Sequence, residues 1–275
     1  LQTAVGGAAA LLSIHLCGLT GALLFFFLTR KHLAGNSDHS TPRIYLAAGM
    51  LGAMLVYLAS VIFEKGGILL SLSGSLAGQT LAASVAESFY KKGGRRSPLI
   101  QRIFSPALML PGSVLIGIKA GVSPLWIALS WTPGIILMIQ QSMNARNTLK
   151  YGTPRTVVFN YISALILIIP LFLITRKADP GEIYGQVTNL PWYIFAGGGL
   201  IGIFTTGMIA FMLLKAPALL VVLGIFAGEL AGGIFLDLHN GNQVAVEKII
   251  AVILIAMGLG SGKINFRRGL AGYNR

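Results

Sequence analysis

Long apolar runs separated by short polar turns are the feature that most limits how this chain can fold. Most runs hold about 18 to 23 residues, enough at about 1.5 Å per residue to cross roughly 30 Å of hydrocarbon. Only helices or closed barrels satisfy backbone hydrogen bonds inside lipid, and these runs are too long and too uniformly apolar for barrel strands. The sequence therefore predicts an all-α polytopic membrane protein. The predicted helices cover about residues 7–29, 44–63, 68–89, 103–118, 124–146, 155–175, 192–214, 218–236 and 248–262.

Composition and charge agree with a membrane protein. Hydrophobic residues make up 55% of the chain and charged residues only 11%, against about 25% charged in ordinary soluble domains. When the loops are threaded alternately to two sides, 16 of the 21 Lys and Arg residues fall on one side, which predicts that this side and the C-terminus are cytoplasmic. No basic patch with interleaved aromatic residues appears, so nucleic acid is not an expected partner. The lone cysteine, Cys17, excludes an internal disulfide and a cysteine-based metal site.

An internal repeat divides the chain into two halves. Residues 45–87 align without a gap on residues 195–237, so that Gly49 meets Gly199, Lys65 meets Lys215 and Gln79 meets Glu229. We predict a first transmembrane repeat at 1–119, a second at 124–265 and a cytoplasmic basic tail at 266–275.

The two predicted repeats differ by one helix. A second aligned block places Gly6 on Gly152, and only the second of these glycines is preceded by a full span, at 124–146. We therefore expect that the first repeat lacks its first helix, leaving about nine helices in this chain; a cleaved signal peptide is the alternative explanation. With that helix restored, each repeat has five spans, and an odd number inserts the second repeat upside down. Inverted repeats are typical of secondary transporters, whose substrate sites lie near the midplane.

The second half carries an ordered set of motifs. The stretch IQQSMNARNTLKYGTP holds Gln140 and Asn144 followed by a Gly-x-Pro, and an Asn-bearing span with Asn160, a Pro-Trp-Tyr entry and the sequence AGELAGG come next. This set resembles the YdcZ-like branch of the drug/metabolite transporter superfamily. The resemblance implies a bacterial inner-membrane permease that works on a small-molecule substrate in the lipid bilayer, without naming the substrate. The first half departs from the pattern because it lacks its Gln-x-x-x-Asn helix.

Glu229 is an acidic residue close to the middle of a predicted span. An ionised carboxylate at that depth costs at least about 2.5 kcal/mol, so it should face the bundle interior or a wet cavity. It could bind a proton or cation during transport, or it could be a protonated acid that hydrogen-bonds a neighbouring helix for packing alone. Gln79 occupies the matching position in the first repeat, where helix–helix hydrogen bonding and ligand contact are both open.

Further polar and aromatic residues are candidates for a substrate or coupling site. Gln140, Asn144 and Asn147 recur on one helix face, as a polar route or as interhelical hydrogen bonding. His15 and Tyr161 occupy matching repeat positions, with Asn160 beside the latter; a proton relay and a neutral core histidine are both open for His15. Trp131 could stack on a cationic or aromatic substrate, or simply pack.

Glycine pairs with small-xxx-small spacing favour close helix packing. They duplicate in both halves, which predicts that they form the seam between the repeats. The predicted packing glycines are Gly74, Gly78, Gly198, Gly202, Gly224 and Gly228.

Together these patterns predict a secondary-active transporter that moves a small metabolite or amphiphilic compound by alternating access, with possible proton coupling through Glu229. A passive channel or uniporter is the alternative. No phosphate-binding loop is present, so ATP is not expected to drive transport directly. An enzyme is not expected because only one of the eight acidic residues lies deep in a span, and no cofactor or metal is predicted. The sequence does not predict an oligomeric state.

Overall fold

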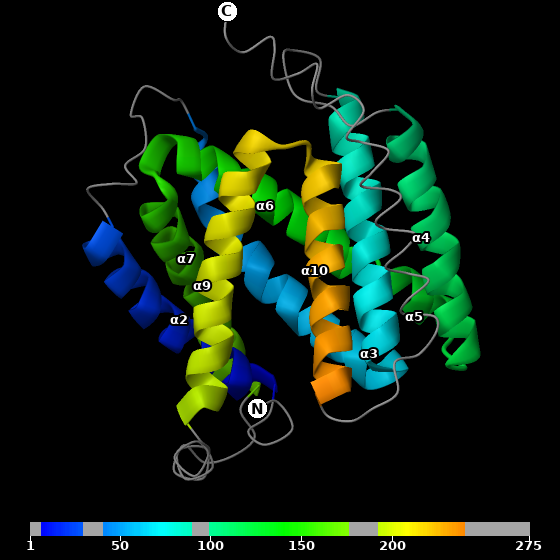
Figure 1. The fold of residues 1–275 in the computed structure, drawn as a ribbon. Helices are drawn as coiled ribbons and strands as arrows, with labels where there is room; N and C mark the ends of the chain where they lie inside the picture. The colour runs from blue at the N-terminus through cyan, green and yellow to red at the C-terminus, as the bar shows by residue number, and fades with distance from the viewer. Residues whose placement is uncertain (1–6, 30–40, 90–98, 176–191, 240–275) are drawn as a thin grey trace, which may run out of the picture. The chain divides into compact units, whose positions relative to one another are not determined.

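The protein is α-helical throughout the part that the computed structural model describes, residues 7–29, 41–89, 99–175 and 192–239 (Figure 1). This confirms the predicted all-α fold class. The predicted helix at 248–262 and the basic tail at 266–275 lie outside the described residues. The elements are α2 (Gly7–Thr29), the 3-10 helix η1 (Arg43–Ala47), α3 (Ala48–Phe89), α4 (Leu99–Lys119), α5 (Pro124–Leu129), α6 (Thr132–Tyr151), α7 (Thr153–Thr175), α9 (Trp192–Lys215) and α10 (Ala218–His239).

A glycine interrupts α3 between the two spans that the sequence predicts there. Gly67 has φ 75° and ψ 177°, a conformation that glycine adopts without the steric cost of a β-carbon. In the second half, α9 ends at Lys215 and α10 begins at Ala218. Both interruptions thus follow the lysines, Lys65 and Lys215, that the ungapped alignment pairs. This agreement supports the internal repeat, which stays a prediction.

The predicted single span at 124–146 is two helices in the structure. α5 ends at Leu129, α6 begins at Thr132, and Ser130 and Trp131 form a turn between them. The cause is Pro133, which has no N–H to donate and whose ring would clash with the carbonyl four residues earlier, that of Leu129. The hydroxyl of Ser130 donates to the carbonyl of Ile127 at 2.6 Å and satisfies one of the exposed carbonyls at the end of α5.

The chain forms two compact units. Unit 1 comprises residues 1–65 and 136–214, and unit 2 comprises residues 66–135 and 215–275. Each unit contains residues from both predicted repeats. The boundaries of the compact units therefore differ from those of the predicted repeats. The repeat boundaries therefore stay a prediction.

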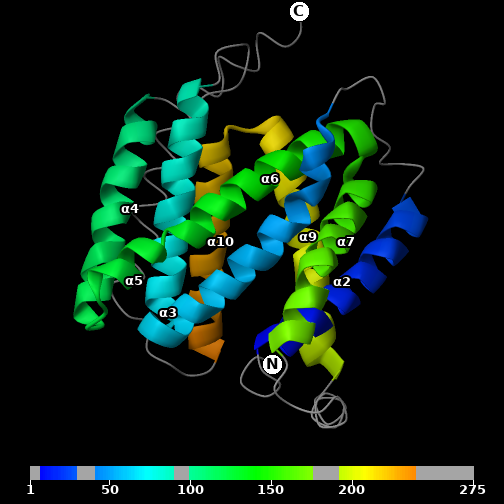
Figure 2. The ribbon, with the colours of Figure 1, turned by 180° about the vertical axis from the view of Figure 1, so that it is seen from behind.

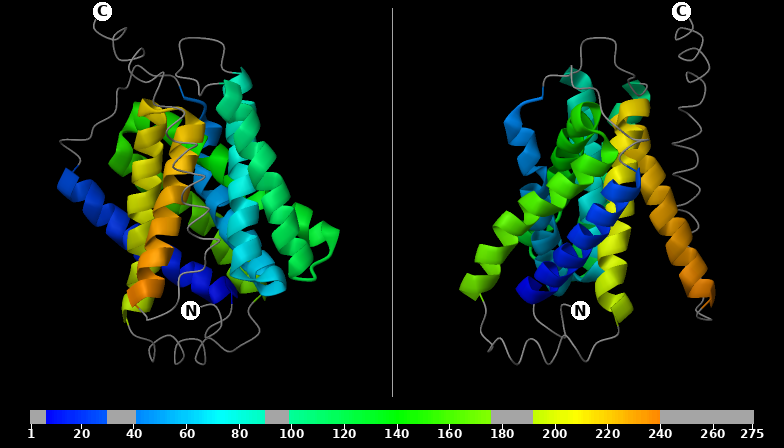
Figure 3. Two further views of the ribbon diagram at one scale, coloured as in Figure 1. Left: turned by 45° about the vertical axis from the view of Figure 1, so that its right-hand side comes forward. Right: turned by 90° about the vertical axis from the view of Figure 1, so that its left-hand side faces the viewer.

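Within unit 1, α2 packs along α7 and α9 approaches both (Figures 2 and 3). Ala22, Val157 and Tyr161 form a buried cluster between α2 and α7. The Tyr161 ring lies where a β-carbon on Gly18 would be, and a β-carbon on Gly199 would come within 2.7 Å of the Gly18 nitrogen. Small residues thus let α2 and α9 meet at backbone distance and leave room for the Tyr161 ring of α7. Two of the predicted packing glycines lie on this side of α9, Gly198 near Ile14 and Gly202 at the Tyr161 hydroxyl.

Within unit 2, the second part of α3 lies against the turn between α5 and α6. A β-carbon on Gly74 would meet the Ser130 hydroxyl, and one on Gly78 would meet the Trp131 carbonyl. A β-carbon on Gly134 would meet the Ser75 carbonyl. The backbones therefore touch at these positions. For Gly224 and Gly228 no described atom lies within 4 Å of the place that a β-carbon would take, so their packing role stays a prediction.

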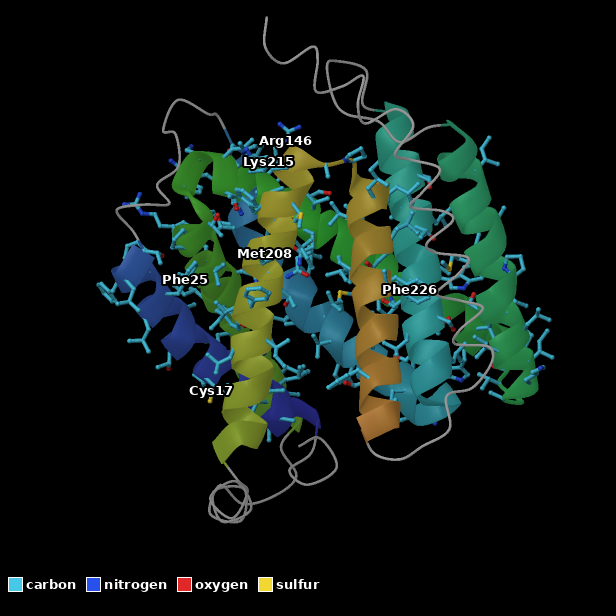
Figure 4. The ribbon with its side chains drawn as sticks, viewed as in Figure 1. Cys17, Phe25, Arg146, Met208, Lys215 and Phe226 are labelled. Carbon is cyan, nitrogen blue, oxygen red and sulfur yellow. The ribbon has the colours of Figure 1, made fainter. Side chains whose placement is uncertain are left out.

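Apolar side chains cover the outside of the helices. Leu28 is 80% exposed on α2, Ile174 is 82% exposed on α7, and Phe204 is 67% exposed on α9. Met208, labelled in Figure 4, belongs to the same exposed side of α9. Polar side chains, in contrast, fill many buried positions. This distribution is the reverse of that in a water-soluble protein and suits a lipid surrounding.

Four helical segments among the described residues are long and apolar enough to cross a membrane. They are Ala9–Thr29, Arg43–Gly67, Thr153–Ile174 and Gly197–Lys215. Met109–Lys119 and Ala218–Gly228 are shorter apolar helices. The length and composition of these helices agree with a polytopic membrane protein.

The close approach at Gly134 predicts an effect on stability. Gly134→Ala should lower the free energy of unfolding by about 1–3 kcal/mol or more, because the atoms that the new methyl group meets are the Ser75 carbonyl and the Gln79 nitrogen, and backbone atoms cannot swing aside. Thermal unfolding of the detergent-purified protein measures this. Gly112→Ala in α4 is the matched control, since no described atom lies within 4 Å of its β-carbon position. Equal melting temperatures for the two variants would contradict the predicted backbone contact.

Candidate functional site

α6 carries the largest group of buried polar side chains described in unit 1. Gln140, Gln141, Asn144, Asn147 and Thr148 are each less than a tenth exposed. Burying an amide costs free energy unless it is hydrogen-bonded, so the partners of these side chains decide how the helix is held. Between them, Ser142 is exposed and its hydroxyl is satisfied by the Met138 carbonyl at 2.8 Å.

Three amides meet at one oxygen. Asn160 Oδ1, on α7, accepts a hydrogen bond from Gln140 Nε2 at 3.1 Å and another from Asn144 Nδ2 at 3.1 Å. All three side chains are buried, Asn144 completely. The Gln-x-x-x-Asn spacing places both donors on one face of α6, one turn apart, where a single acceptor on α7 can reach them. The structure thus brings together three of the residues that the sequence predicts as site residues.

Two glycines at the start of α3 lie close behind this amide cluster of Gln140, Asn144 and Asn160. A β-carbon on Gly52 would meet the Gln140 amide, and one on Gly49 would meet the Asn160 carbonyl. The Gly49 N–H donates to the Ser163 hydroxyl at 3.0 Å. α3 therefore packs against the α7 backbone at Gly49 and against the Gln140 side chain at Gly52, and the amides have little room to leave the cluster.

Asn147 extends the polar face toward the end of α6. Its Nδ2 donates to the Tyr45 carbonyl in η1 at 2.7 Å. A carbonyl can only accept, so the amide nitrogen must face Tyr45 and the amide oxygen must face away from it. The contact joins residues 102 positions apart, which explains why sequence periodicity alone does not predict it.

Four buried oxygens on α6 have no hydrogen-bond partner in the structure. They are Gln141 Oε1, Asn144 Oδ1, Asn147 Oδ1 and Thr148 Oγ1. Buried polar atoms without partners are uncommon in folded proteins and each needs an explanation. Gln141 and Thr148 were not predicted as site residues, although Gln141 lies in a predicted span and Thr148 lies just after it.

His15 and Tyr161 meet on the other side of unit 1. The two rings lie edge to face, with centroids 5.8 Å apart. Tyr161 donates its hydroxyl to the Gly199 carbonyl at 3.0 Å, and His15 Nδ1 lies 2.8 Å from the Leu11 carbonyl. Because a carbonyl only accepts, Nδ1 carries the proton and Nε2 is the acceptor of the neutral ring. Both residues thus have partners within the helix packing, which leaves the proton relay a hypothesis.

Gln79 and Trp131 belong to unit 2 and have separate partners. Gln79 is buried and its Nε2 lies 3.4 Å from the Ser75 hydroxyl in the same helix. Trp131 Nε1 donates to the Ser113 hydroxyl of α4 at 2.9 Å, which fixes one end of the indole. The helix–helix hydrogen bond of Trp131 was not predicted, since no local pattern marks Ser113.

Glu229 is part of α10, but its side chain lies outside the described part of the chain. Its role as a coupling residue therefore stays a prediction. Among the described residues no group of three or more His, Cys, Asp or Glu side chains could hold a metal ion.

Arg146 lies on the exposed side of α6, close to the end of that helix at Tyr151 (Figure 4). Lys150 lies with its ammonium nitrogen 5.3 Å from the Tyr151 ring centroid. Arg155 lies 5.9 Å from the centroid of the Phe26 ring. Basic residues with long side chains collect in this way at the ends of membrane helices, where their charges reach the headgroups.

The helices have apolar outer surfaces, and a set of amides is buried between them. These features are typical of an α-helical integral membrane protein with a polar interior. Comparison with known families agrees: residues 1–115 and 125–260 match the family described as "Putative inner membrane exporter, YdcZ". The chain therefore belongs to this family of inner-membrane exporters, as the motif order in its second half predicts. A comparison with curated proteins found no match. The family assignment indicates an inner-membrane transporter that is surrounded by lipid and acts on a small molecule.

Asn160 is the residue whose loss should disturb the amide cluster most. Asn160→Leu has a similar shape but no acceptor, so it should leave Gln140 Nε2 and Asn144 Nδ2 unpaired and lower the free energy of unfolding by about 1–3 kcal/mol. Asn160→Asp keeps an oxygen acceptor and should be less destabilising. Thermal unfolding of the purified protein measures both. If the Leu variant melts at the wild-type temperature, the two hydrogen bonds contribute nothing measurable.

Proposed function

We propose that this protein is a secondary transporter that exports a small metabolite or amphiphilic compound by alternating access, and that the amide cluster lies on its polar route. Membership of an inner-membrane exporter family supports the class of activity. The predicted inverted repeats support the mechanism, because two similar halves of opposite orientation can exchange inward-open and outward-open arrangements.

The observation that carries the proposal is the buried amide cluster. Amides that only held helices together would need partners for each polar atom, yet Asn144 pairs its nitrogen with Asn160 and leaves its oxygen without a partner. An acceptor that is buried but unpaired suits a surface that is completed by a passing ligand.

Energy coupling through Glu229 is the second part of the proposal. A single carboxyl group within a transmembrane helix is costly when charged and can be neutralised by a proton, so it can link solute movement to the proton gradient. A passive channel or a uniporter is the alternative mechanism, in which Glu229 would serve packing alone.

Transport by the full-length protein in proteoliposomes tests the first part. A panel of labelled amino acids, organic acids and lipophilic cations identifies a transported solute, and Gln140→Leu should then lower its uptake by at least about tenfold, because one amide of the cluster is lost. Ser142→Ala on the exposed side of the same helix should transport at the wild-type rate. Equal loss in both variants, or in neither, would show that the cluster has no specific part in transport.

The coupling prediction uses the same vesicles loaded with a pH-sensitive dye. Glu229→Gln should abolish solute-dependent proton flux, while labelled solute still equilibrates down its own gradient. Wild-type proton flux in the Glu229→Gln variant would contradict coupling through this residue. A wild-type protein that equilibrates solute without any proton movement would be a uniporter.

A further inference from the structure

The four unpartnered oxygens of α6 occupy consecutive turns of the helix. Asn147 and Thr148 stand three and four residues after Asn144, so the β-carbon of each lies about 5–6 Å from that of Asn144. Gln141 stands one turn before Asn144 and shares the side of Thr148. All four belong to unit 1 and each is at least nine-tenths buried. We call Asn144, Asn147 and Thr148 the oxygen triad.

Within the described part of the chain, the amide nitrogens beside these oxygens donate to other groups and none of them donates to the triad. The nitrogen of Asn147 donates to the Tyr45 carbonyl, and those of Asn144 and Gln140 donate to Asn160. No Lys or Arg side chain in the described part of the chain donates to these oxygens either, since none of the four has a hydrogen-bond partner. The surface is therefore made of neutral acceptors, together with one hydroxyl that can accept.

A surface of this kind selects the charge of its ligand. Amide carbonyl and hydroxyl oxygens repel anions, and they replace the hydration shell of a monovalent cation in the way that carbonyl rings do in channels. A divalent ion would need carboxylates to repay its dehydration, and the described residues hold no acidic cluster that could supply them. The partial negative charge at the C-terminal end of α6, where the triad lies, also favours a cation.

We propose that the oxygen triad of Asn144, Asn147 and Thr148 binds a monovalent cation, either an alkali-metal ion or the ammonium group of an amine. Three neighbouring acceptors on the last turns of one helix suit a ligand with a single positive charge, such as an alkali-metal ion or a primary ammonium group with its three N–H donors. Gln141 adds a fourth acceptor one turn away, about 4.5 Å along the helix axis. The idea that this cation is transported rests on the proposed function. Its binding to the triad does not.

Thermal unfolding of the purified full-length protein tests binding without any transport assay. The melting temperature is measured at constant ionic strength with choline chloride replaced stepwise by sodium, potassium or methylammonium chloride. Choline carries a positive charge but no N–H donor on its nitrogen, so it serves as the reference cation. We expect a saturable rise in melting temperature with at least one of the three small cations, because a ligand that binds only the folded state stabilises it.

The variants locate the site. Thr148→Val keeps the shape and removes one oxygen, and it should raise the half-saturating cation concentration by about tenfold, the effect of one lost bond to a charged ligand. Ser142→Ala leaves the triad intact and should show the wild-type concentration dependence. The wild-type titration alone keeps the proposal testable if Thr148→Val does not fold.

The pattern of responses separates the sources of the ligand. A rise with sodium or potassium assigns an alkali-metal ion, and a rise with methylammonium alone assigns an amine. No rise with any of the three relative to choline would overturn the proposal, and so would an unchanged response in a folded Thr148→Val variant or an equal response to magnesium. Because solute uptake is measured separately, transport without cation binding would refute this inference and leave the proposed function standing.

Discussion

The cost of leaving a polar group unpaired away from water governs where side chains lie in this protein. Leu28, Ile174 and Phe204 lie outside, whereas Gln140, Asn144 and Asn160 lie inside, held by two hydrogen bonds to a single oxygen. In lipid the apolar exterior gains nothing from burial, so the helices of unit 1 are held by close packing and by these internal hydrogen bonds. Gly49 and Gly52 serve the same requirement, because without β-carbons they leave room for the Asn160 backbone and the Gln140 amide.

Much of the fold could be predicted from the sequence because hydropathy depends on local composition. Most predicted spans agree with the described helices to within a few residues, and Gly67 marks the interruption between the predicted spans at 44–63 and 68–89. The break between α5 and α6 was missed, although Pro133 signals it, because hydropathy stays high across the turn. The grouping into two units could not be predicted, since it depends on contacts between residues far apart in the sequence.

The candidate site was predicted only in part, for a similar reason. Helical spacing correctly places Gln140, Asn144 and Asn147 on one face of α6, but it says nothing of their partners, which are Asn160 in α7 and the Tyr45 backbone. Gln141 and Thr148 were overlooked because a periodicity argument assumes one buried face for each helix. Much of the second half of α6 is covered on more than one side, so its polar residues do not fall on a single stripe.

Neutral oxygens have an advantage over a carboxylate where a ligand must bind and then leave. A fixed negative charge in a buried site holds a cation strongly and is costly when the site empties, whereas an unfilled set of amide and hydroxyl oxygens costs only unmade hydrogen bonds. Conduction and transport both need binding that is favourable enough to enter and weak enough to release. The oxygen triad meets this condition without acidic residues. The coupling proposed for Glu229 would meet it differently, because protonation removes the charge of a carboxyl group, so the two proposed sites would suit different ions.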